Sequence, residues 1–386
     1  MTQNRPKIAI VYFPWAAESI YNFIQEIVNI IDPLSSSIVI IGGNKYNFKN
    51  SFNNNKINLI NTYLKMHNTS EIQPLILSKI IWGLKAILVQ ILNSFAILRY
   101  SKDIDIVLFY MAYPHFLLPL FTSKFLGKKT VEVVTRQKNA EKKNINRFLS
   151  YQDPIIYNII DGVSPESKSL LPHLKLDETK IKILSDGHRY IDTNIFHCKK
   201  KYENRNKIGF ISRLEKSKGI MNLLKAIAIL NEENIEIEFI IGGDGNLKND
   251  VLNEIEIMKN NNINIRYIGW ISKEEMPFWL NEFKILILPT EEDAFPTIIL
   301  ESMACGTLVL TTKIGALPDI IEDGITGFFM DNTNPEVIAE NIKRVLNHSN
   351  IENIIKSSKI LIDSNYSYNV VVDNWKNIIQ ELIYES

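Results

Sequence analysis

The chain has 386 residues, 46% hydrophobic and 22% charged, and its 43 Lys and Arg residues equal its 43 Asp and Glu residues. This composition excludes a disordered chain, and 16 Gly and 14 Pro residues exclude a collagen-like one. The length predicts two domains of ordinary size. Two cysteines, Cys198 and Cys305, are too few for a disulfide framework or a thiolate metal cage, which favours a reducing cytoplasmic compartment.

The balanced charge conceals a basic first half and an acidic second half. Residues 1–180 hold 21 Lys and Arg against 13 Asp and Glu, a difference of +8, and the remainder holds 22 against 30, a difference of −8. Two interpretations remain open: an anionic partner for the first half, such as a lipid phosphate or a membrane surface, or a solvated dipole. We expect no nucleic-acid partner, because no base-reading motif is visible.

The chain shows no signal-peptide pattern, and its most apolar stretch is Ile72 to Leu98. Lys79 and Lys85 interrupt this stretch, so it lacks the roughly 18 uninterrupted apolar residues of a spanning helix. At helical spacing one half carries the polar residues Ser78, Lys79, Lys85, Gln90, Asn93 and Ser94. The other half carries Ile80, Ile81, Leu84, Leu88, Ile91, Leu92, Phe95 and Leu98. Either this apolar face packs on a sheet, or the helix lies in the plane of a membrane and meets a lipid acceptor there.

Strand-like and helix-like runs alternate along the whole chain, which predicts an α/β architecture with parallel sheets. The expected strands of the first half are 7–13, 37–41, 104–110, 130–134 and 162–163. Those of the second half are 207–212, 236–242, 263–268, 285–288 and 308–311. A lysine-rich stretch, His197 to Lys207, marks the junction, with a linker from about Ser185. Ligands of such sheets bind beyond the carboxyl ends of the strands, so we expect the site in the cleft between the domains.

Three short motifs follow strands of the second half. In GFISRLEKSKG, Arg213 and Lys218 lie five residues apart in a loop before a helix, so two cations and the first amides of that helix can meet one anion such as a pyrophosphate. IIGGDG, with Gly243 in its turn, does not fit the dinucleotide pattern GxGxxG. YIGW ends at Trp270, where backbone groups could meet a base. Each motif alone is also compatible with a purely structural role.

The most specific motif is PTEEDAFPTIILESMACG, Pro289 to Gly306. Asp293 lies in a loop after a strand, and Glu301 lies eight residues later in the helix that follows. The first turn of that helix offers free amides to an anion. A carboxylate farther inside can accept both hydroxyls of a ribose.

These motifs, in this order, resemble the retaining glycosyltransferases of family 4. The resemblance covers the second half nearly end to end, through DGITGF. It implies the GT-B fold, two Rossmann-like doubly wound parallel-sheet domains that face each other across a cleft. The implied domains are residues 1–184 on the acceptor side, 185–365 for the nucleotide-sugar, and 366–386 as a carboxyl-terminal helix that returns to the first domain.

The resemblance also implies roles for individual residues. Arg213 and Lys218 bind the diphosphate of a nucleotide-sugar and assist catalysis, and Glu301 binds the ribose. The donor-binding set implied in the second half is Arg213, Lys218, Gly243, Trp270, Ile271, Phe295, Thr297, Ile298 and Glu301, with backbone of Thr297 and Ile298 on the phosphates and of Ile271 on the base. Asp293 takes the first acidic position of the family's paired glutamates, close to the donor sugar. The family has Glu there, and the neighbouring Glu292 leaves the register open by one residue.

The first half departs further from the family. Ala16 and Ala17 stand where the family has two glycines that approach the donor phosphate. The family's histidine is replaced in the region of Thr135 and Arg136, and His115 is the nearest alternative catalytic residue. The pair Asp103 and Asp105 spells DxD but opens a strand, so we interpret it as structural and expect no metal and no other cofactor.

The sequence therefore predicts a metal-independent hexosyltransferase-type enzyme. It would move a sugar from a nucleotide diphosphate donor, with UDP favoured over GDP, to a glycan or polyprenyl-linked acceptor in cell-surface polysaccharide or glycolipid assembly. We expect a cytoplasmic protein, with peripheral contact to the cytoplasmic membrane face through its basic first half. The alternatives are a nucleotide-sugar 2-epimerase, which would turn over donor without acceptor, and a non-catalytic nucleotide-sugar binder.

Overall fold

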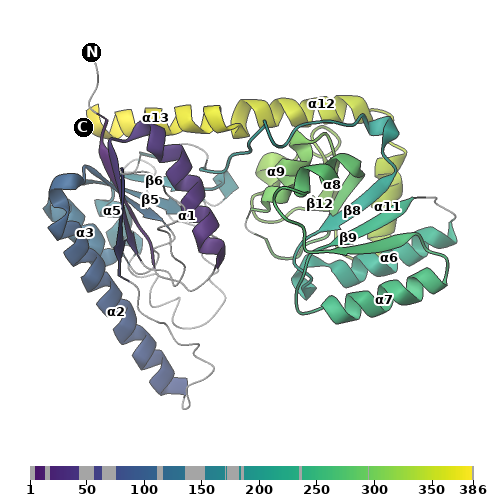
Figure 1. Cartoon of the computed structure of the whole chain (residues 1–386), viewed down its shortest axis with the longest axis horizontal. Helices are drawn as coiled ribbons and strands as arrows, with labels where there is room; N and C mark the ends of the chain where they lie inside the picture. Colours follow the sequence, from purple (N-terminus) through teal and green to yellow (C-terminus); the bar gives the residue numbers. More distant parts are fainter. Residues whose placement is uncertain are drawn as a thin grey trace. The chain divides into compact units, whose positions relative to one another are not determined.

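The computed structural model divides the chain into two compact units, residues 1–188 with 371–386, and residues 189–370 (Figure 1). It describes residues 5–13, 18–42, 56–62, 75–110, 116–134, 153–169, 171, 182–183, 187–233, 237–293 and 295–384. Each unit is built around a parallel β-sheet with helices on both faces, which is the doubly wound α/β architecture that the sequence predicts.

The sheet of the first unit has seven strands in the order β3-β2-β1-β4-β5-β6-β7. All of its pairings are parallel. The strands are β1 (Lys7–Val11), β2 (Ser37–Gly42), β3 (Ile57–Asn61), β4 (Ile106–Tyr110), β5 (Lys129–Val134), β6 (Gly162–Pro165) and β7 (Lys182–Ile183). The central strand β4 reads IVLFY and is buried at every position, as expected for a strand covered on both faces.

Five helices belong wholly or mainly to the first unit: α1 (Glu18–Ile31), α2 (Leu75–Arg99), α3 (Leu117–Phe125), α5 (Asp153–Ile159) and α13 (Tyr368–Tyr384). Figure 1 shows α1 on one face of the sheet and α2, α3 and α5 on the other. Among the described residues, no helix is both long enough and apolar enough to cross a membrane.

The DxD pair lies at the amino-terminal edge of this sheet. An Asp105 carboxylate oxygen accepts a hydrogen bond of 2.8 Å from the backbone N–H of Lys7, and the Lys7 ammonium lies 3.4 Å from Asp103. The pair therefore fixes the start of β1 beside β4, which confirms its structural interpretation.

The sheet of the second unit has six strands in the order β10-β9-β8-β11-β12-β13, all parallel. The strands are β8 (Lys207–Ile211), β9 (Glu238–Gly242), β10 (Ile265–Gly269), β11 (Phe283–Leu288), β12 (Leu308–Thr312) and β13 (Phe328–Met330). One continuous apolar core lies between this sheet and its helices. Ten strands agree with the predicted ones, and β3, β7 and β13 are additions that the sequence pattern did not indicate.

The helices of the second unit form two groups around its sheet. On one face lie α6 (Ile220–Glu232), α7 (Lys248–Asn260) and α11 (Pro335–Leu346). A second group contains α8 (Met276–Glu282), α9 (Thr297–Ala304) and α12 (Ile351–Leu361), and the short α10 (Leu317–Ile320) follows β12. Five residues of π-helix, Ile362–Tyr366, follow α12.

The lysine-rich stretch 197–207, expected at the junction, packs as part of the second unit. Its Arg205 side chain is buried and donates to the backbone oxygens of Phe283 at 3.0 Å, Cys305 at 2.8 Å and Lys200 at 2.6 Å, and to Thr307 Oγ1 at 2.9 Å. Burial lowers the pKa of this guanidinium below its usual value. This role could not be predicted, because nothing in a run of basic residues distinguishes a buried arginine from exposed lysines.

Candidate functional site

A buried lysine joins two loops at the carboxyl ends of the strands of the second unit. Lys218 lies between β8 and α6, and its ammonium contacts the loop after β11. It donates to the backbone oxygen of Glu292 at 2.8 Å and pairs with a carboxylate oxygen of Asp293 at 2.5 Å. The Lys218 side chain is only 5% exposed. These contacts use two of its three N–H donors, which offsets the cost of burying the charge.

The same contacts show which of the two neighbouring acidic residues pairs with Lys218, a choice that the sequence left open. The carboxylate of Asp293 is partly buried and meets Lys218, whereas the Glu292 side chain is exposed and only its backbone oxygen takes part. Asp293 therefore provides the carboxylate next to the buried ammonium. The hydrogen bond to the Glu292 carbonyl could not be predicted from the sequence, because every residue type has a backbone oxygen.

Gly219 allows the two loops to come this close. Its φ is +70°, and a Cβ at this position would lie 2.0 Å from the backbone oxygen of Pro289. Beside it, the backbone N–H of Glu291 donates to the Ser217 oxygen at 2.8 Å, and Thr290 Oγ1 donates to the same oxygen at 3.2 Å. Any larger residue at 219 would push the loop of Lys218 away from the loop of Asp293.

The IIGGDG turn supports the loop of Arg213 through backbone contacts. Gly243 has a φ of +124°, and a Cβ there would lie 1.8 Å from the backbone oxygen of Ser212. The N–H of Leu214 donates to the Asp244 oxygen at 2.9 Å, and that of Gly243 donates to the Gly269 oxygen at 2.7 Å. The loops after β8, β9 and β10 are thus hydrogen-bonded side by side, and Gly243 permits the contact.

Arg213 and Lys218 have different partners in this structure. The Arg213 side chain is 63% exposed, and its Nη1 lies 2.8 Å from Glu215 Oε1. Lys218 is buried against Asp293. The two cations belong to one loop, but the structure does not pair them on a common carboxylate.

The helix α9 presents the remaining residues of the predicted motif. It begins after Pro296, whose side chain makes no capping hydrogen bond, so Thr297 and Ile298 form the first turn with unpaired amide donors typical of a helix start. Both are half-buried, as is Glu301 one turn later. Phe295, just before the helix, is buried and has the Arg189 guanidinium 6.0 Å from its ring centroid.

Two predicted residues follow β10. Trp270 is largely exposed, whereas Ile271 is buried, and a Cβ added at Gly242 would lie 2.6 Å from Ile271 Cδ1. Ile271 thus closes the core beneath the glycine turn, and Trp270 faces solvent. The predicted residues Ala16, Ala17, His115, Thr135 and Arg136 lie outside the described residues.

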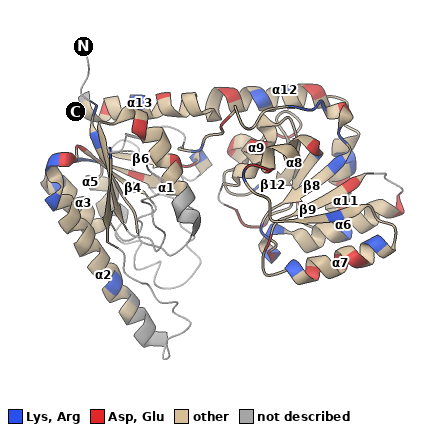
Figure 2. Cartoon of the chain, viewed as in Figure 1, with Lys and Arg blue, Asp and Glu red and all other residues tan. Residues whose placement is uncertain are grey.

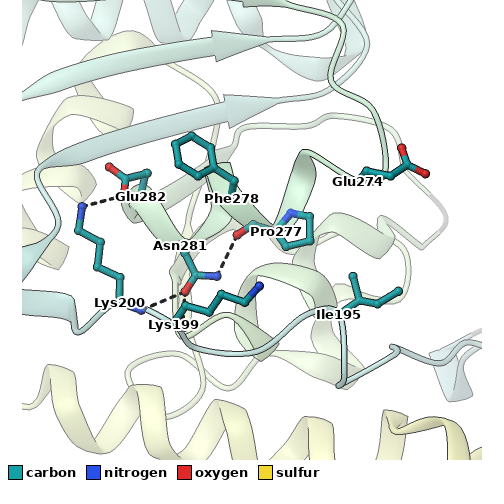
Figure 3. Close-up of a pocket in the computed structure, with 8 residues that line it drawn as sticks. All are labelled: Ile195, Lys199, Lys200, Glu274, Pro277, Phe278, Asn281 and Glu282. Carbon is teal, nitrogen blue, oxygen red and sulfur yellow. Dashed lines mark hydrogen bonds and ion pairs between the residues drawn. The ribbon is translucent and has the colours of Figure 1, made fainter.

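A hollow of about 360 Å³ lies beside α8 (Figure 3). Its lining residues come from the segment before β8 and from α8 with the residue two places before it: Ile195, Lys199, Lys200, Glu274, Pro277, Phe278, Asn281 and Glu282. Asn281 Oδ1 accepts from the N–H of Lys199 at 2.6 Å, and Asn281 Nδ2 donates to the backbone oxygens of Pro277 at 2.9 Å and His197 at 3.1 Å. None of the predicted site residues lines this hollow, so it is separate from the candidate site.

The chain is similar to known proteins in sequence and in fold. Residues 192–361 match the family model described as "Glycosyl transferases group 1". A glycosyltransferase from Rickettsia africae has the same fold, with a TM-score of 0.74 at 20% identity over 100% of both chains. The Anabaena protein Alr3699/HepE, solved in complex with UDP, has a TM-score of 0.73 at 13% identity over 97% of this chain and 100% of that one. These similarities confirm the GT-B class of fold.

One curated relative is the Campylobacter jejuni enzyme named GalNAc-alpha-(1->4)-GalNAc-alpha-(1->3)-diNAcBac-PP-undecaprenol alpha-1,4-N-acetyl-D-galactosaminyltransferase. It is 23% identical over 67% of this chain and 70% of its own length. For several other curated relatives the match spans about half of their length, between 43% and 53%.

Proposed function

We propose that this chain transfers a sugar from a nucleotide diphosphate donor to a glycan or lipid-linked acceptor, because residues 192–361 of its second unit match the family model of the group 1 glycosyl transferases. The observation that carries the proposal is the buried ammonium of Lys218, held at the carboxyl ends of β8 and β11 by Asp293. Ligands of doubly wound sheets bind at these strand ends, and a low-dielectric environment strengthens the attraction between this cation and a diphosphate.

Each residue of the site has a distinct part in the proposed reaction. The Lys218 ammonium and the Arg213 guanidinium neutralise the negative charge that grows on the diphosphate as the bond from the sugar C1 to its phosphate oxygen breaks. The first-turn amides of α9, at Thr297 and Ile298, face the same charge. Glu301 accepts hydrogen bonds from the ribose hydroxyls.

Asp293 changes its partner in this proposal. Its carboxylate is bound to Lys218 at 2.5 Å. A bound diphosphate competes for that ammonium, and the carboxylate then accepts hydrogen bonds from the hydroxyls of the donor sugar. Backbone near Trp270 and Ile271 meets the base. Gly243 and Phe295 shape the loops around the donor rather than react.

The acceptor hydroxyl attacks C1 on the face from which the diphosphate departs, and its proton passes to the departing phosphate oxygen. The new C1–O bond therefore has the configuration of the broken one, which is retention. We propose that this step needs no metal, since two cationic side chains and a helix start supply the positive charge. Ala16, Ala17 and His115 remain predictions for the donor and acceptor side of the first unit.

A UDP-sugar is the favoured donor class, ahead of a GDP-sugar. It is supported by the fold shared with a structure solved in complex with UDP. A hexosyl group and an acceptor linked to polyprenyl diphosphate are supported by the Campylobacter relative, whose name includes undecaprenol. We propose that the reaction belongs to cell-surface polysaccharide or glycolipid assembly on the cytoplasmic side of the membrane.

The experiment incubates the full chain with UDP-, GDP- and ADP-sugars, with and without membrane lipid extract, and measures released nucleotide. Release of one nucleotide that rises when extract is added supports the transferase. Conversion of the donor sugar to its 2-epimer without acceptor supports an isomerase instead. Donor binding without release in any mixture supports a non-catalytic binder.

A further inference from the structure

The helix α2 packs on its unit through a face of mixed polarity and presents large apolar side chains outward. Asn93 and Ser94 are buried, and Asn93 Oδ1 accepts a hydrogen bond of 2.6 Å from Thr62 Oγ1. The buried residues around them include the small or branched Ala86, Val89, Ala96 and Ile97. The helix is therefore held on the unit through a face that is partly polar, which reverses the usual arrangement of a sheet-packed helix.

The outward face of α2 consists of large apolar side chains. They recur at helical positions i, i+3, i+4, i+7, i+11 and i+14, so they form one stripe along the helix: Leu84, Ile87, Leu88, Ile91, Phe95 and Leu98. Between residues 83 and 98, these are all of the exposed positions of the helix. The sequence-based interpretation that this apolar face packs on the sheet is wrong.

The neighbouring helix α3 extends the stripe. Gln90 Oε1 accepts a hydrogen bond of 3.1 Å from the backbone N–H of Leu118, so the start of α3 lies against the middle of α2. Leu118 and Phe121 are exposed, and the Phe125 side chain is 89% exposed. Nine large apolar side chains on two packed helices thus form one surface, which we call the α2–α3 face. Contiguous apolar patches on a protein surface mark interaction sites.

Charge decides which partner suits the α2–α3 face. Residues 75–99 and 117–125 contain Lys79, Lys85, Arg99 and Lys124 and no Asp or Glu. Lys124 is paired with Asp161 at 2.8 Å, so the positive charge of this face comes from α2. In Figure 2 the described part of α2 is accordingly tan with blue and without red. A second copy of the chain would bring the same cations against each other. Anionic lipid headgroups would neutralise them, while the apolar stripe enters the acyl region.

We propose that the α2–α3 face is the membrane-docking surface of this chain, with α2 lying in the plane of a bilayer that contains anionic lipids. The inner side of α2 stays on the protein, where Asn93 bonds Thr62, and its outer side enters the boundary between headgroups and acyl chains. Phe95, Phe121 and Phe125 supply the aromatic side chains that favour this boundary. The proposal does not rest on sugar transfer, because docking is measured without donor.

The test is co-sedimentation of the full chain with vesicles of phosphatidylcholine and phosphatidylglycerol, and with vesicles of phosphatidylcholine alone. The variant Phe95→Gln/Phe125→Gln removes two exposed rings from the face. Phe278→Gln is the matched control, because Phe278 of the second unit is 61% exposed and Phe95 is 62% exposed. Since all three side chains are exposed, we expect unchanged thermal unfolding of the variants.

We expect the wild type to bind the anionic vesicles more strongly than the neutral ones. The double variant should lose at least about tenfold in partitioning, because burial of each ring contributes to docking, and Phe278→Gln should bind as the wild type does. Equal partitioning of the double variant and the wild type would overturn the proposal. So would a wild type that ignores anionic vesicles and is dimeric in light scattering, with a monomeric double variant, since a second copy would then cover the face.

Discussion

The ammonium of Lys218 lies 2.5 Å from a carboxylate oxygen of Asp293, across 75 positions of sequence. Lys218 lies in the loop after β8, and Asp293 lies in the loop between β11 and α9. The pair therefore fixes the distance between two loops at the carboxyl edge of the sheet. Because Lys218 is nearly buried, the loss of either partner leaves a charge without compensation.

Asp293→Asn should lower both stability and turnover. The variant keeps the size of the side chain but leaves the Lys218 ammonium without a carboxylate, which costs about 3 kcal/mol in the free energy of unfolding. We expect the rate of donor turnover to fall by about tenfold or more. Urea unfolding and nucleotide release measure the two effects.

Two further variants define the role of that carboxylate. Asp293→Glu, which restores the residue typical of family 4, should retain most of the activity. Glu292→Gln, at the exposed neighbour, should behave as the wild type in both assays. Loss of activity in Glu292→Gln with an unaffected Asp293→Asn would transfer the role to Glu292.

Glu301→Gln should reduce the ability of the site to distinguish a ribose from a deoxyribose. If the carboxylate accepts both ribose hydroxyls, its loss should weaken UDP binding by roughly tenfold to a hundredfold, the range of a charged hydrogen bond. Binding of 2′-deoxy-UDP, which lacks one of these hydroxyls, should weaken less. Calorimetric titration of both nucleotides measures the ratio, with Glu340→Gln, at an exposed position of α11, as control. A ratio that the substitution leaves unchanged argues against contact with ribose.

Gly219→Ala and Gly324→Ala form a matched pair, because their φ angles are +70° and +74°. Nothing lies within 4 Å of a Cβ added at Gly324, so this variant should lose only the about 1 to 2 kcal/mol of a left-handed backbone. At Gly219 the Cβ would lie 2.0 Å from the Pro289 oxygen, and we expect a loss of about 3 kcal/mol.

Nucleotide binding should separate the two glycine variants as clearly as stability does. Gly219→Ala should weaken UDP binding, since the loop of Lys218 must move away from Pro289, and Gly324→Ala should leave binding unchanged. Thermal unfolding and calorimetry supply both comparisons. Equal effects of the two substitutions would mean that the close approach at Gly219 is unimportant.

The ion pairs of Glu282 should make a contribution to the stability of the second unit that is lost in acid. Burial raises its pKa, but hydrogen bonds from the Lys200 and Lys207 ammonium groups at 2.7 and 2.8 Å outweigh burial and hold the pKa below its ordinary value. The group therefore stabilises the fold above the ordinary glutamate pKa, and this contribution is lost as the pH falls through the lowered value. Glu282→Gln should be less stable than the wild type near neutral pH, and the difference should shrink in acid.

Urea unfolding from about pH 7 to about pH 3 tests this dependence, with Glu232→Gln, at an exposed position of α6, as the control. A difference between Glu282→Gln and wild type that stays constant over this range would contradict the ion-pair explanation. The difference in unfolding free energy measures how much the contacts of Lys200 and Lys207 with Glu282 of α8 stabilise the unit.

Much of the architecture follows from residue order alone. Buried parallel strands such as IVLFY and FKILIL are almost continuous apolar runs, so their positions and the doubly wound class could be predicted. The strand β3 reads INLIN and β13 has three residues, too polar or too short to stand out. Which face of α2 packs inward was not predictable, because an amphipathic pattern gives two faces and does not state which one the sheet covers.

The candidate site was predictable by residue type and less so by contact. The motifs placed Lys218, Asp293 and Glu301 in adjoining loops and in one helix, because parallel strands end at a common edge. They could not assign the buried ammonium to Asp293 rather than to Glu292, nor show that Arg213 pairs with Glu215. Such choices depend on backbone direction within a loop, which residue spacing does not determine.

Calorimetric titration of UDP into three forms of the chain tests most directly whether Lys218 belongs to a diphosphate site: the wild type, Lys218→Ala and Lys216→Ala. Lys216 is an exposed lysine of the same short helical turn, so its removal changes the charge of the loop equally. We predict that Lys218→Ala, with a folded circular dichroism spectrum, binds UDP at least about tenfold more weakly, and that Lys216→Ala binds as the wild type does. Equal affinities of all three forms would contradict the assignment of Lys218 to the donor diphosphate.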